Sequence, residues 1–509
     1  MTVQVVWLKR DLRVFDHRPL FEAAQHGRLV PLYIVEPALW QQADSSARQW
    51  RFVRQCLEEL DQKLRHLYGQ GLVVRVGEAV NVLCDLQQAY GVNALWSHAE
   101  TGNAWTYARD RDVAAWAREQ GIPWHEYRQD GVICRLNSRY GWAEHWARFM
   151  ADPTTPVPES LQCLKMASEP LPEAEQLCPA SATLPDACPA AQAGGRSHAL
   201  RLLDSFLHVR GVNYAKGMSS PLTAETACSR LSPHLAYGTL SMREVVHACE
   251  ARKAEIPAGW GRALAAFTSR LAWQSHFMQK LESEPALEFY NLHPALRFER
   301  QALDPVLFDA WAHGKTGYPL IDACMRMLHA TGWINFRMRA MLAAFACYHL
   351  WQPWREAGLH LARLFIDYEP GIHWSQMQMQ SGSTGINAFR IYNPVKQSRD
   401  QDPDGHFIRR WIPELKRVPA EWIHEPWRLT ADLQRRYGCL IGTDYPKPVV
   451  EHESAARAAR EQLHRAYKGT EARHASRQVL DKHGSRKKHA PIPRKTANVA
   501  PKAQMSLFE

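Results

Sequence analysis

The chain has 509 residues, of which 46% are hydrophobic and 22% charged, and its formal net charge is +10 at pH 7. This composition is that of a globular protein long enough for two or three domains, and it excludes the fibrous and fully disordered classes. No run of about 18 apolar residues is present, which excludes a membrane-spanning helix.

The N-terminus and the cysteines indicate a cytoplasmic protein. The opening sequence MTVQVVWLKRDLR has only a short apolar run and is charged at Lys9, so it does not read as a signal peptide. The eleven cysteines include no C-x-x-C pair. We therefore expect reduced thiols, no metal or iron–sulfur site, and a cytoplasmic location.

Strands and helices alternate through residues 1–150. Strands are predicted at 3–8, 29–35, 71–77, 94–98 and 122–128, and helices at 18–27, 45–68, 80–90 and 105–119. The alternation predicts an α/β domain with a doubly wound parallel sheet, in which helices cover both faces. No G-x-G-x-x-G follows the first strand, so a nicotinamide dinucleotide fold is not indicated.

Three further segments follow. Residues 151–199 are rich in proline and lack periodicity, which predicts an inter-domain linker. Residues 200–450 are predicted to form an all-α domain, because helical periodicity is strong at 200–210, 239–255, 260–282, 319–332 and 336–350. The tail, 451–509, has 13 Lys or Arg against 6 Asp or Glu, a net charge of +7. One helix is predicted there at 451–467, and disorder is predicted for 483–509.

The segment 311–394 combines helical apolar spacing with many ionisable side chains. These are Asp322, Arg326, Arg337, Arg339, Asp367, Glu369 and His373. A buried charge is costly unless it is paired or bound to a ligand. A pocket for a large polar ligand is therefore predicted in this segment.

The segment 228–241, CSRLSPHLAYGTLS, places Ser229, Arg230 and Ser232 at the start of a predicted helix. Hydroxyls, free backbone amides and a guanidinium together form a phosphate-binding site. A serine cap beside a surface arginine is the alternative. The GKTG sequence at 314–317 is not a Walker loop, because position 309 is Asp309 rather than glycine and no strand precedes it.

Four sequence motifs follow one another along the chain. They are VVWLKRDLRVFDHRPL at 5–20, SRLSPHLAYGTLS at 229–241, WAHGKTGYPLIDACMRMLHATGW at 311–333 and RIYNPVKQSRDQDPDGHFIRRWIPEL at 390–415. In these motifs the chain resembles the photolyase/cryptochrome superfamily over residues 1 to about 420. The resemblance implies an N-terminal α/β antenna domain, a long linker and an all-α domain that binds FAD.

The resemblance also implies the residues that hold FAD. Arg339 and Asp367 look like the ion pair flanking the isoalloxazine ring, with Glu369 as a neighbouring acid. His373 falls where a residue faces flavin N5 and is expected to titrate near neutral pH; a structural histidine is the alternative. The implied cofactor-binding set is Tyr214, Cys228, Ser229, Arg230, Leu231, Ser232, Phe267, Gln274, Trp333, Phe336, Arg339, Asp367, Glu369 and His373.

Several positions depart from the pattern of the superfamily. Arg270 stands where photolyases use a Glu that bonds to the damaged pyrimidines, and Phe336 and Ala340 replace a pocket Asn and Met. Of two pocket tryptophans, Trp273 remains and the second becomes Met379. Losing the carboxylate removes a partner for the lesion.

The light-driven electron chain of three tryptophans keeps only its middle member, Trp354, because Met377 and Gln301 occupy the other places. An alternative path is open through Trp351, Trp374 or Trp411. The candidate catalytic positions are therefore Trp273, Arg270, His373, Trp354 and Met379.

Two functions fit this pattern. The first is blue-light-driven, FAD-dependent repair of a flipped-out pyrimidine lesion in DNA with an atypical pocket. The second is a cryptochrome-like photoreceptor, or a DNA-binding flavoprotein, without repair of cyclobutane dimers. UV-damaged DNA is the expected partner, and the basic tail adds to its binding.

Two further interactions are expected. An antenna chromophore of folate or deazaflavin type would contact Glu100 in the α/β domain; an ordinary loop is the alternative. The C-terminal residues look like the short motif by which bacterial repair proteins bind the sliding clamp, and they are Gln504, Met505, Ser506, Leu507 and Phe508. The protein itself is expected to be a monomer.

Overall fold

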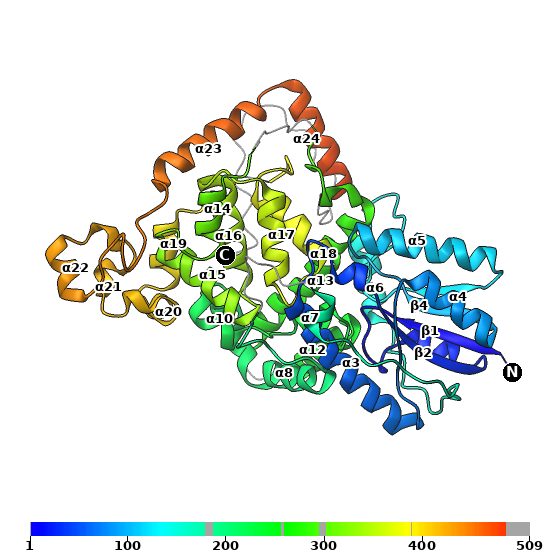
Figure 1. The fold of residues 1–509 in the computed structure, drawn as a ribbon. Helices are drawn as coiled ribbons and strands as arrows, with labels where there is room; N and C mark the ends of the chain where they lie inside the picture. Colours follow the sequence, from blue (N-terminus) through cyan, green and yellow to red (C-terminus); the bar gives the residue numbers. More distant parts are fainter. Residues whose placement is uncertain (1, 179–186, 256–258, 295–301, 388, 485–509) are drawn as a thin grey trace.

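A computed structural model describes residues 2–178, 187–255, 259–294, 302–387 and 389–484 (Figure 1). The N-terminal part forms a five-stranded sheet in the order β3-β2-β1-β4-β5, and every paired strand is parallel. The strands are β1 (Val3–Leu8), β2 (Arg28–Val35), β3 (Val73–Val76), β4 (Val92–His98) and β5 (Trp124–Tyr127).

Helices cover both faces of this sheet. Side chains alternate along β1. Val5 and Trp7 pack with α4 (Ala79–Tyr90) and α5 (Ala104–Glu119) on one face of the sheet. Val6 and Leu8 pack with α1 (Arg18–Ala23) and α3 (Ala47–Tyr68) on the other. This confirms the predicted doubly wound α/β domain. Its helices are α1 (Arg18–Ala23), α2 (Pro37–Trp40), α3 (Ala47–Tyr68), α4 (Ala79–Tyr90), α5 (Ala104–Glu119) and α6 (Trp142–Ala151).

The predicted linker runs along the sheet. Leu29 in β2 accepts from Leu164 N and donates its own N–H to Gln162 O, and Glu169 N donates to Val74 O. One short helix, α7 (Ala174–Leu177), lies in this segment. The predicted domain boundaries at 150, 199 and 450 stay predictions.

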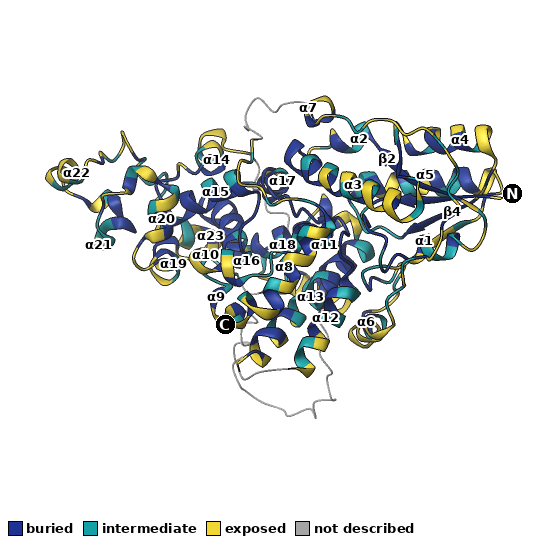
Figure 2. Ribbon diagram, turned by 90° about the horizontal axis from the view of Figure 1, so that it is seen from below, coloured by how far each residue is buried: buried dark blue, intermediate teal, exposed yellow. Residues whose placement is uncertain are grey.

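The remaining chain is helical among the described residues, as predicted. Buried residues concentrate in central helices such as α16 (Phe336–Ala344) and α18 (Pro370–Gln380) (Figure 2). Exposed residues lie on outer helices such as α22 (Ala431–Tyr437). The helices are α8 (Arg196–His208), α9 (Tyr214–Gly217), α10 (Pro221–Ala227), α11 (Ser232–Ala236), α12 (Met242–Ala254), α13 (Gly261–Ser283), α14 (Pro305–Ala312), α15 (Pro319–Thr331), α16 (Phe336–Ala344), α17 (Trp354–Leu364), α18 (Pro370–Gln380), α19 (Pro394–Gln401), α20 (His406–Trp411), α21 (Ala420–Ile423) and α22 (Ala431–Tyr437).

Helices α13 and α18 pack against each other closely at the centre of this domain. A Cβ atom at Gly371 would lie 2.6 Å from the Cα atom of Met278, so α18 can approach α13 here only with glycine. Helix α16 ends in a π-helical turn over Phe345–His349. These three helices position most of the polar side chains described below.

Asp322 is fully buried on α15 and anchors the turn that precedes this helix. Its Oδ1 accepts from Thr316 N and Thr316 Oγ1 at 2.8 and 2.6 Å, and its Oδ2 accepts from Gly317 N and Tyr445 Oη at 3.0 and 2.5 Å. The carboxylate therefore has a structural partner for each oxygen.

Replacing Asp322 by asparagine is expected to lower the free energy of unfolding by about 2 kcal/mol, because the new amide N–H₂ faces donors that it cannot accept from. Urea unfolding followed by circular dichroism measures this. Asp309→Asn is the control, since the Asp309 side chain is 69% exposed. Equal stability of the two variants would contradict the structural role.

Two helices follow residue 450. The first, α23 (His452–Ala466), agrees with the helix predicted at 451–467. The second, α24 (Thr470–His483), lies in a stretch for which the sequence predicted no element. The disorder predicted for 483–509 falls almost entirely outside the described residues. Helix α24 is held by tertiary contacts, since His293 Nε2 lies 3.0 Å from Ala472 O and 3.1 Å from Ser476 Oγ. The clamp-like motif at 504–508 lies outside the described residues.

Across the part of the chain that the structure describes, no helix combines the length and apolarity that crossing a membrane requires.

Candidate functional site

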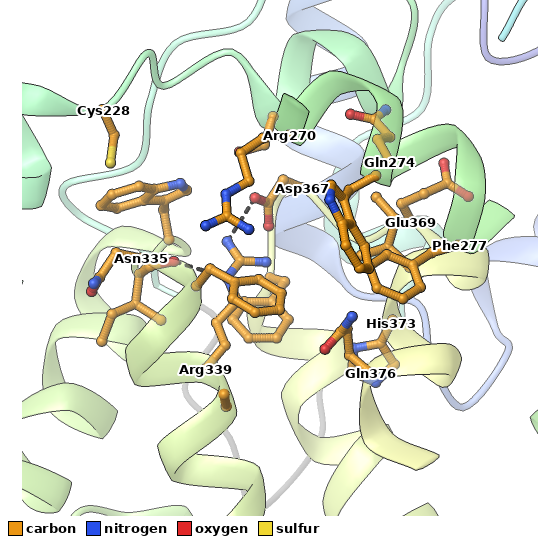
Figure 3. A pocket seen from close by; sticks show the side chains of 18 of the residues that line it. Cys228, Arg270, Gln274, Phe277, Asn335, Arg339, Asp367, Glu369, His373 and Gln376 are labelled. Atoms are coloured by element: carbon orange, nitrogen blue, oxygen red, sulfur yellow. Dashed lines mark hydrogen bonds and ion pairs between the residues drawn. The ribbon is translucent and has the colours of Figure 1, made fainter. Parts of the chain in front are cut away.

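A cavity of about 290 Å³ opens between α13, α16 and α18 (Figure 3). Most residues of the predicted cofactor and catalytic sets line it. They are Tyr214, Cys228, Ser229, Ser232, Phe267, Arg270, Trp273, Gln274, Trp333, Phe336, Arg339, Asp367, Glu369 and His373. The sequence therefore located the pocket from residues that lie as far apart as 214 and 373.

Other predicted residues lie elsewhere. Leu231 is a core residue with 1% exposure, and the Arg230 guanidinium stacks 3.9 Å from the Trp333 ring centre at the edge of the cavity. Met379 and Trp354 are also absent from the lining. Met379 lies beyond Ile372 and Gln376, at the edge of their face of α18, and its place in the pocket stays a prediction.

Of the seven ionisable side chains named above for 311–394, five line the cavity. Asp322 and Arg326 are the exceptions, since Asp322 anchors the turn described above and Arg326 Nη1 pairs with Glu414 at 2.9 Å. Burial raises the pKa of Asp322, and hydrogen bonds from Thr316 and Tyr445 oppose that rise. The pocket predicted in this segment therefore involves five of these side chains, and Asp322 and Arg326 have structural roles.

Arg339 and Asp367 form the central ion pair of the cavity. Arg339 Nη2 donates to Asp367 Oδ2 at 2.6 Å, and its Nε donates to Ile334 O at 2.8 Å. In Figure 3 Arg270 and Arg339 extend from two sides toward Asp367. Asp367 Oδ1 is buried and has no hydrogen-bond partner within the described residues, so one carboxylate oxygen remains available to a ligand.

The segment 228–232 presents polar groups at another side of the cavity. Arg230 has φ of 64°, a left-handed conformation that turns the chain sharply between Ser229 and Ser232. Arg210 Nη1 donates to Cys228 O at 2.5 Å and fixes the start of this turn. Both serine side chains then line the cavity, which fits the predicted phosphate site.

Glu369 joins the two domains beside the cavity. Its Oε1 accepts from Gly371 N at the start of α18, and its Oε2 lies 3.3 Å from Arg10 Nη2 of the N-terminal domain. Burial raises the pKa of Glu369 to about 7 against the opposing effect of Arg10. Arg10 also donates to Tyr368 O and Ala236 O, so one N-terminal side chain braces the pocket wall.

His373 is neutral in this environment. Its Nε2 lies 2.9 Å from Gly358 O, which can only accept, so Nε2 carries the ring proton and Nδ1 has the lone pair. Burial lowers the pKa of His373 to about 3. The expectation that His373 titrates near neutral pH is therefore wrong, because burial disfavours the charged form of the ring.

The sequence missed several polar lining residues. Gln376 and Gln380 follow His373 by three and seven positions, and the side-chain amides of both are buried without partners among the described residues. Asn335 Oδ1, ahead of α16, is also orphaned there. Helical spacing from His373 would have identified both glutamines. Orphaned polar atoms around a cavity are what a large polar ligand would satisfy.

Two tryptophans lie behind the cavity wall. The Trp374 ring centre is 4.9 Å from that of His373 and 6.0 Å from that of Trp354. Trp354 Nε1 donates to Asn291 Oδ1 at 2.8 Å. Met377, which occupies the inner place of the expected electron chain, lines the cavity itself. Three rings thus connect the cavity wall with Trp354.

A second cavity, of about 80 Å³, lies at the carboxyl ends of β1 and β2, and Tyr237, Tyr368 and Pro370 of the helical part also line it. Glu100 lines it and accepts from Arg109 Nη2 at 2.7 Å, while Arg109 Nη1 donates to Glu36 at 2.8 Å. Burial raises the pKa of Glu36 to about 7. The cavity is small beside ordinary ligand pockets of about 300–1,000 Å³. The antenna role of Glu100 stays a prediction.

Comparisons with known proteins bear on this site. A family model described as the FAD binding domain of DNA photolyase matches residues 267–465, and one described as DNA photolyase matches residues 4–135. A deoxyribodipyrimidine photo-lyase from Streptomyces griseus is 31% identical over 475 residues, which cover 89% of this chain and 97% of the relative. Cryptochrome-1 from Sinapis alba is 30% identical over 481 residues, which cover 89% and 94%.

Solved structures give the same result. A bacterial class III photolyase from Agrobacterium tumefaciens has a TM-score of 0.81 and 26% identity to this chain, and the match covers 92% of this chain and 98% of that one. The sequence identity of this chain to the photolyases is thus nearly the same as its identity to cryptochrome-1.

Proposed function

Because the chain belongs to the photolyase/cryptochrome superfamily, we propose that it is an FAD-dependent enzyme that repairs a pyrimidine lesion in DNA under blue light. Such a reaction is that of a carbon–carbon lyase of the deoxyribodipyrimidine photolyase kind. FAD supplies the light-excited electron when it is bound. The residues of this chain bind and orient the cofactor and the lesion.

The lining residues fit FAD. Ser229 and Ser232 offer hydroxyls for the phosphates, and Asp367 Oδ1 and the amides of Gln376 and Gln380 offer orphaned partners for the polar edge of the ring system. Arg339 holds the Asp367 carboxylate in place through the 2.6 Å hydrogen bond. Binding of a large polar cofactor therefore satisfies groups that are otherwise buried at a cost.

The observation that carries repair is the position of Trp273. It lines the same cavity as the Arg339–Asp367 pair, so a base stacked on Trp273 would lie in the cofactor cavity. Stacking on an aromatic side chain contributes about 1–3 kcal/mol per base. Arg270 lines the cavity as well and replaces the expected carboxylate with a cation, which favours a lesion with acceptor groups or a nearby phosphate.

A photoreceptor is the second candidate. The replacements Arg270, Phe336 and Ala340 all line the cavity, and together they change the polarity of the surface that a cyclobutane dimer would meet. The match to cryptochrome-1 at 30% identity supports this candidate too. In that case the protein binds FAD and absorbs light without splitting the lesion.

Blue-light turnover on oligonucleotides tests the proposal. The fully reduced protein is expected to repair a cyclobutane dimer or a (6-4) product in light and not in darkness, and Trp273→Ala should bind the lesion about 10- to 100-fold more weakly. Leu222→Ala, an exposed position on α10, is the control. Failure to repair either lesion with full flavin reduction would favour the photoreceptor.

We propose DNA as the macromolecular partner on the basis of the family and the basic tail. A monomeric state and a cytoplasmic location stay predictions from the sequence. Contact with a sliding clamp through Gln504–Phe508 stays a prediction from the sequence.

A further inference from the structure

Four basic side chains meet where the loop before α6, the helix α13 and the end of α24 come together. They are Arg139, His276, Lys280 and His483, with exposed fractions of 6%, 8%, 8% and 1%. Arg139 Nη2 lies 2.6 Å from His276 Nδ1 and donates to His276 O at 3.2 Å. None of the four lines the cavity described above.

Aromatic rings enclose this basic cluster. The Arg139 guanidinium lies 5.2 Å from the Trp142 ring centre, and the Lys280 Nζ atom lies 5.2 Å from that of Phe277. Such contacts stabilise a cation only modestly. They supply no hydrogen-bond acceptor to Arg139 Nη1, which is unsatisfied among the described residues.

The acids near the cluster are already engaged. Glu284 pairs with Lys482 and stands 3.9 Å from His483 Nε2, and Glu282 accepts from Arg135 N and Gln279 Nε2. Within the described residues, no carboxylate lies within 4.0 Å of Arg139 or Lys280. Arg139 and Lys280 therefore lack a direct ion-pair partner among the described residues, and Glu284, the acid beside His483, is shared with Lys482.

Two donors of the cluster are orphaned. Arg139 Nη1 and His483 Nδ1 are buried and lack a hydrogen-bond partner in the part of the chain that is described. Burial, followed by the repulsion of Arg139, lowers the pKa of Lys280 to about 7. Unsatisfied buried donors and uncompensated positive charge both raise the free energy of the protein.

We propose that the cluster binds a small free anion carrying a phosphate group. One such anion accepts hydrogen bonds from Arg139 Nη1, Lys280 Nζ and His483 Nδ1, which come from three different segments. A tetrahedral oxyanion has acceptor oxygens in several directions, so it suits three donors better than a planar carboxylate does. Because α24 covers the site, a duplex backbone does not reach it.

The bound anion joins α24 to α13. His483 is the last residue of α24, and Lys280 lies within α13. Helix α24 also contacts His293. The backbone N–H of His293 donates to Ser383 O, just after α18 ends at Gln380. Binding of an anion at this site is therefore expected to stabilise α24 and the C-terminal end of α18, which lines the cavity.

Thermal unfolding of the full chain tests the site with inorganic phosphate, against chloride at matched ionic strength. Phosphate is expected to raise Tm in a saturable way, because a ligand that binds only the folded state stabilises it. Lys280→Met should weaken phosphate binding about tenfold or more. Lys396→Met is the matched control, since its side chain is 70% exposed on α19, and it should keep the wild-type response.

Hydrogen exchange of residues 470–483 gives a second readout. Phosphate should slow exchange there in the wild type and in Lys396→Met, but not in Lys280→Met or His483→Phe. Equal Tm shifts with phosphate and chloride, or an unchanged phosphate response in Lys280→Met, would overturn the site. Displacement of phosphate by a short oligonucleotide lacking a terminal phosphate would overturn the assignment to a free anion.

Discussion

Replacing Arg339 by leucine is expected to weaken FAD binding by about a hundredfold, a loss of about 2.7 kcal/mol. Arg339 is the cation that neutralises Asp367, whose side chain is 2% exposed. Without it the carboxylate is buried alone beside the ligand, and the guanidinium contact to Ile334 O is lost as well. Titration of the apoprotein with FAD, followed by flavin fluorescence, measures the change.

The control for this variant is Arg326→Leu. The Arg326 side chain is 22% exposed and that of Arg339 is 23% exposed, and both pair with a carboxylate, but Arg326 lies outside the cavity. If Arg326→Leu also lost FAD a hundredfold, the effect would come from general destabilisation. Asp367→Asn keeps the shape of the side chain and should show the loss of charge alone.

The layered fold follows from local patterns in the sequence. Strands with buried residues on both faces, such as β1, produce continuous apolar runs, and the helices between them have a clear apolar stripe. The sheet order 3-2-1-4-5 does not follow from such patterns. It depends on contacts between segments far apart in the chain, which periodicity does not describe.

The site was predicted least well where long-range contacts decide the position of a side chain. Met377 lines the cavity and Met379 does not, although Met379 lies close to the helical face of Ile372, which does, so spacing along α18 alone does not decide its position. The contact of Arg10 with Glu369 joins residues in different domains, and no local signal marks it. Helix α24 was not predicted, and it packs on His293, a contact that no local pattern in the sequence marks.

Replacing Trp374 by phenylalanine is expected to reduce light-driven reduction of bound FAD by an external thiol to the rate seen in darkness. The expected inner tryptophan of the electron chain is Met377, and a thioether is a poor relay. Trp374 is fully buried between His373 at the cavity wall and Trp354, with ring centres 4.9 and 6.0 Å apart. Trp354, 8% exposed, completes the path toward the surface, where the thiol supplies the electrons and is oxidised to a disulfide.

If electrons pass through Trp374, substitution of the other tryptophans should have different effects on flavin reduction. Trp354→Phe should block reduction as Trp374→Phe does, because the two rings act in series. Trp411→Phe removes a half-buried ring on α20 and should leave the rate unchanged. Absorbance of the flavin under continuous blue light measures all three variants. If Trp411→Phe alone slowed reduction, the electrons would enter from α20, and the contact between Trp374 and Trp354 would serve packing only.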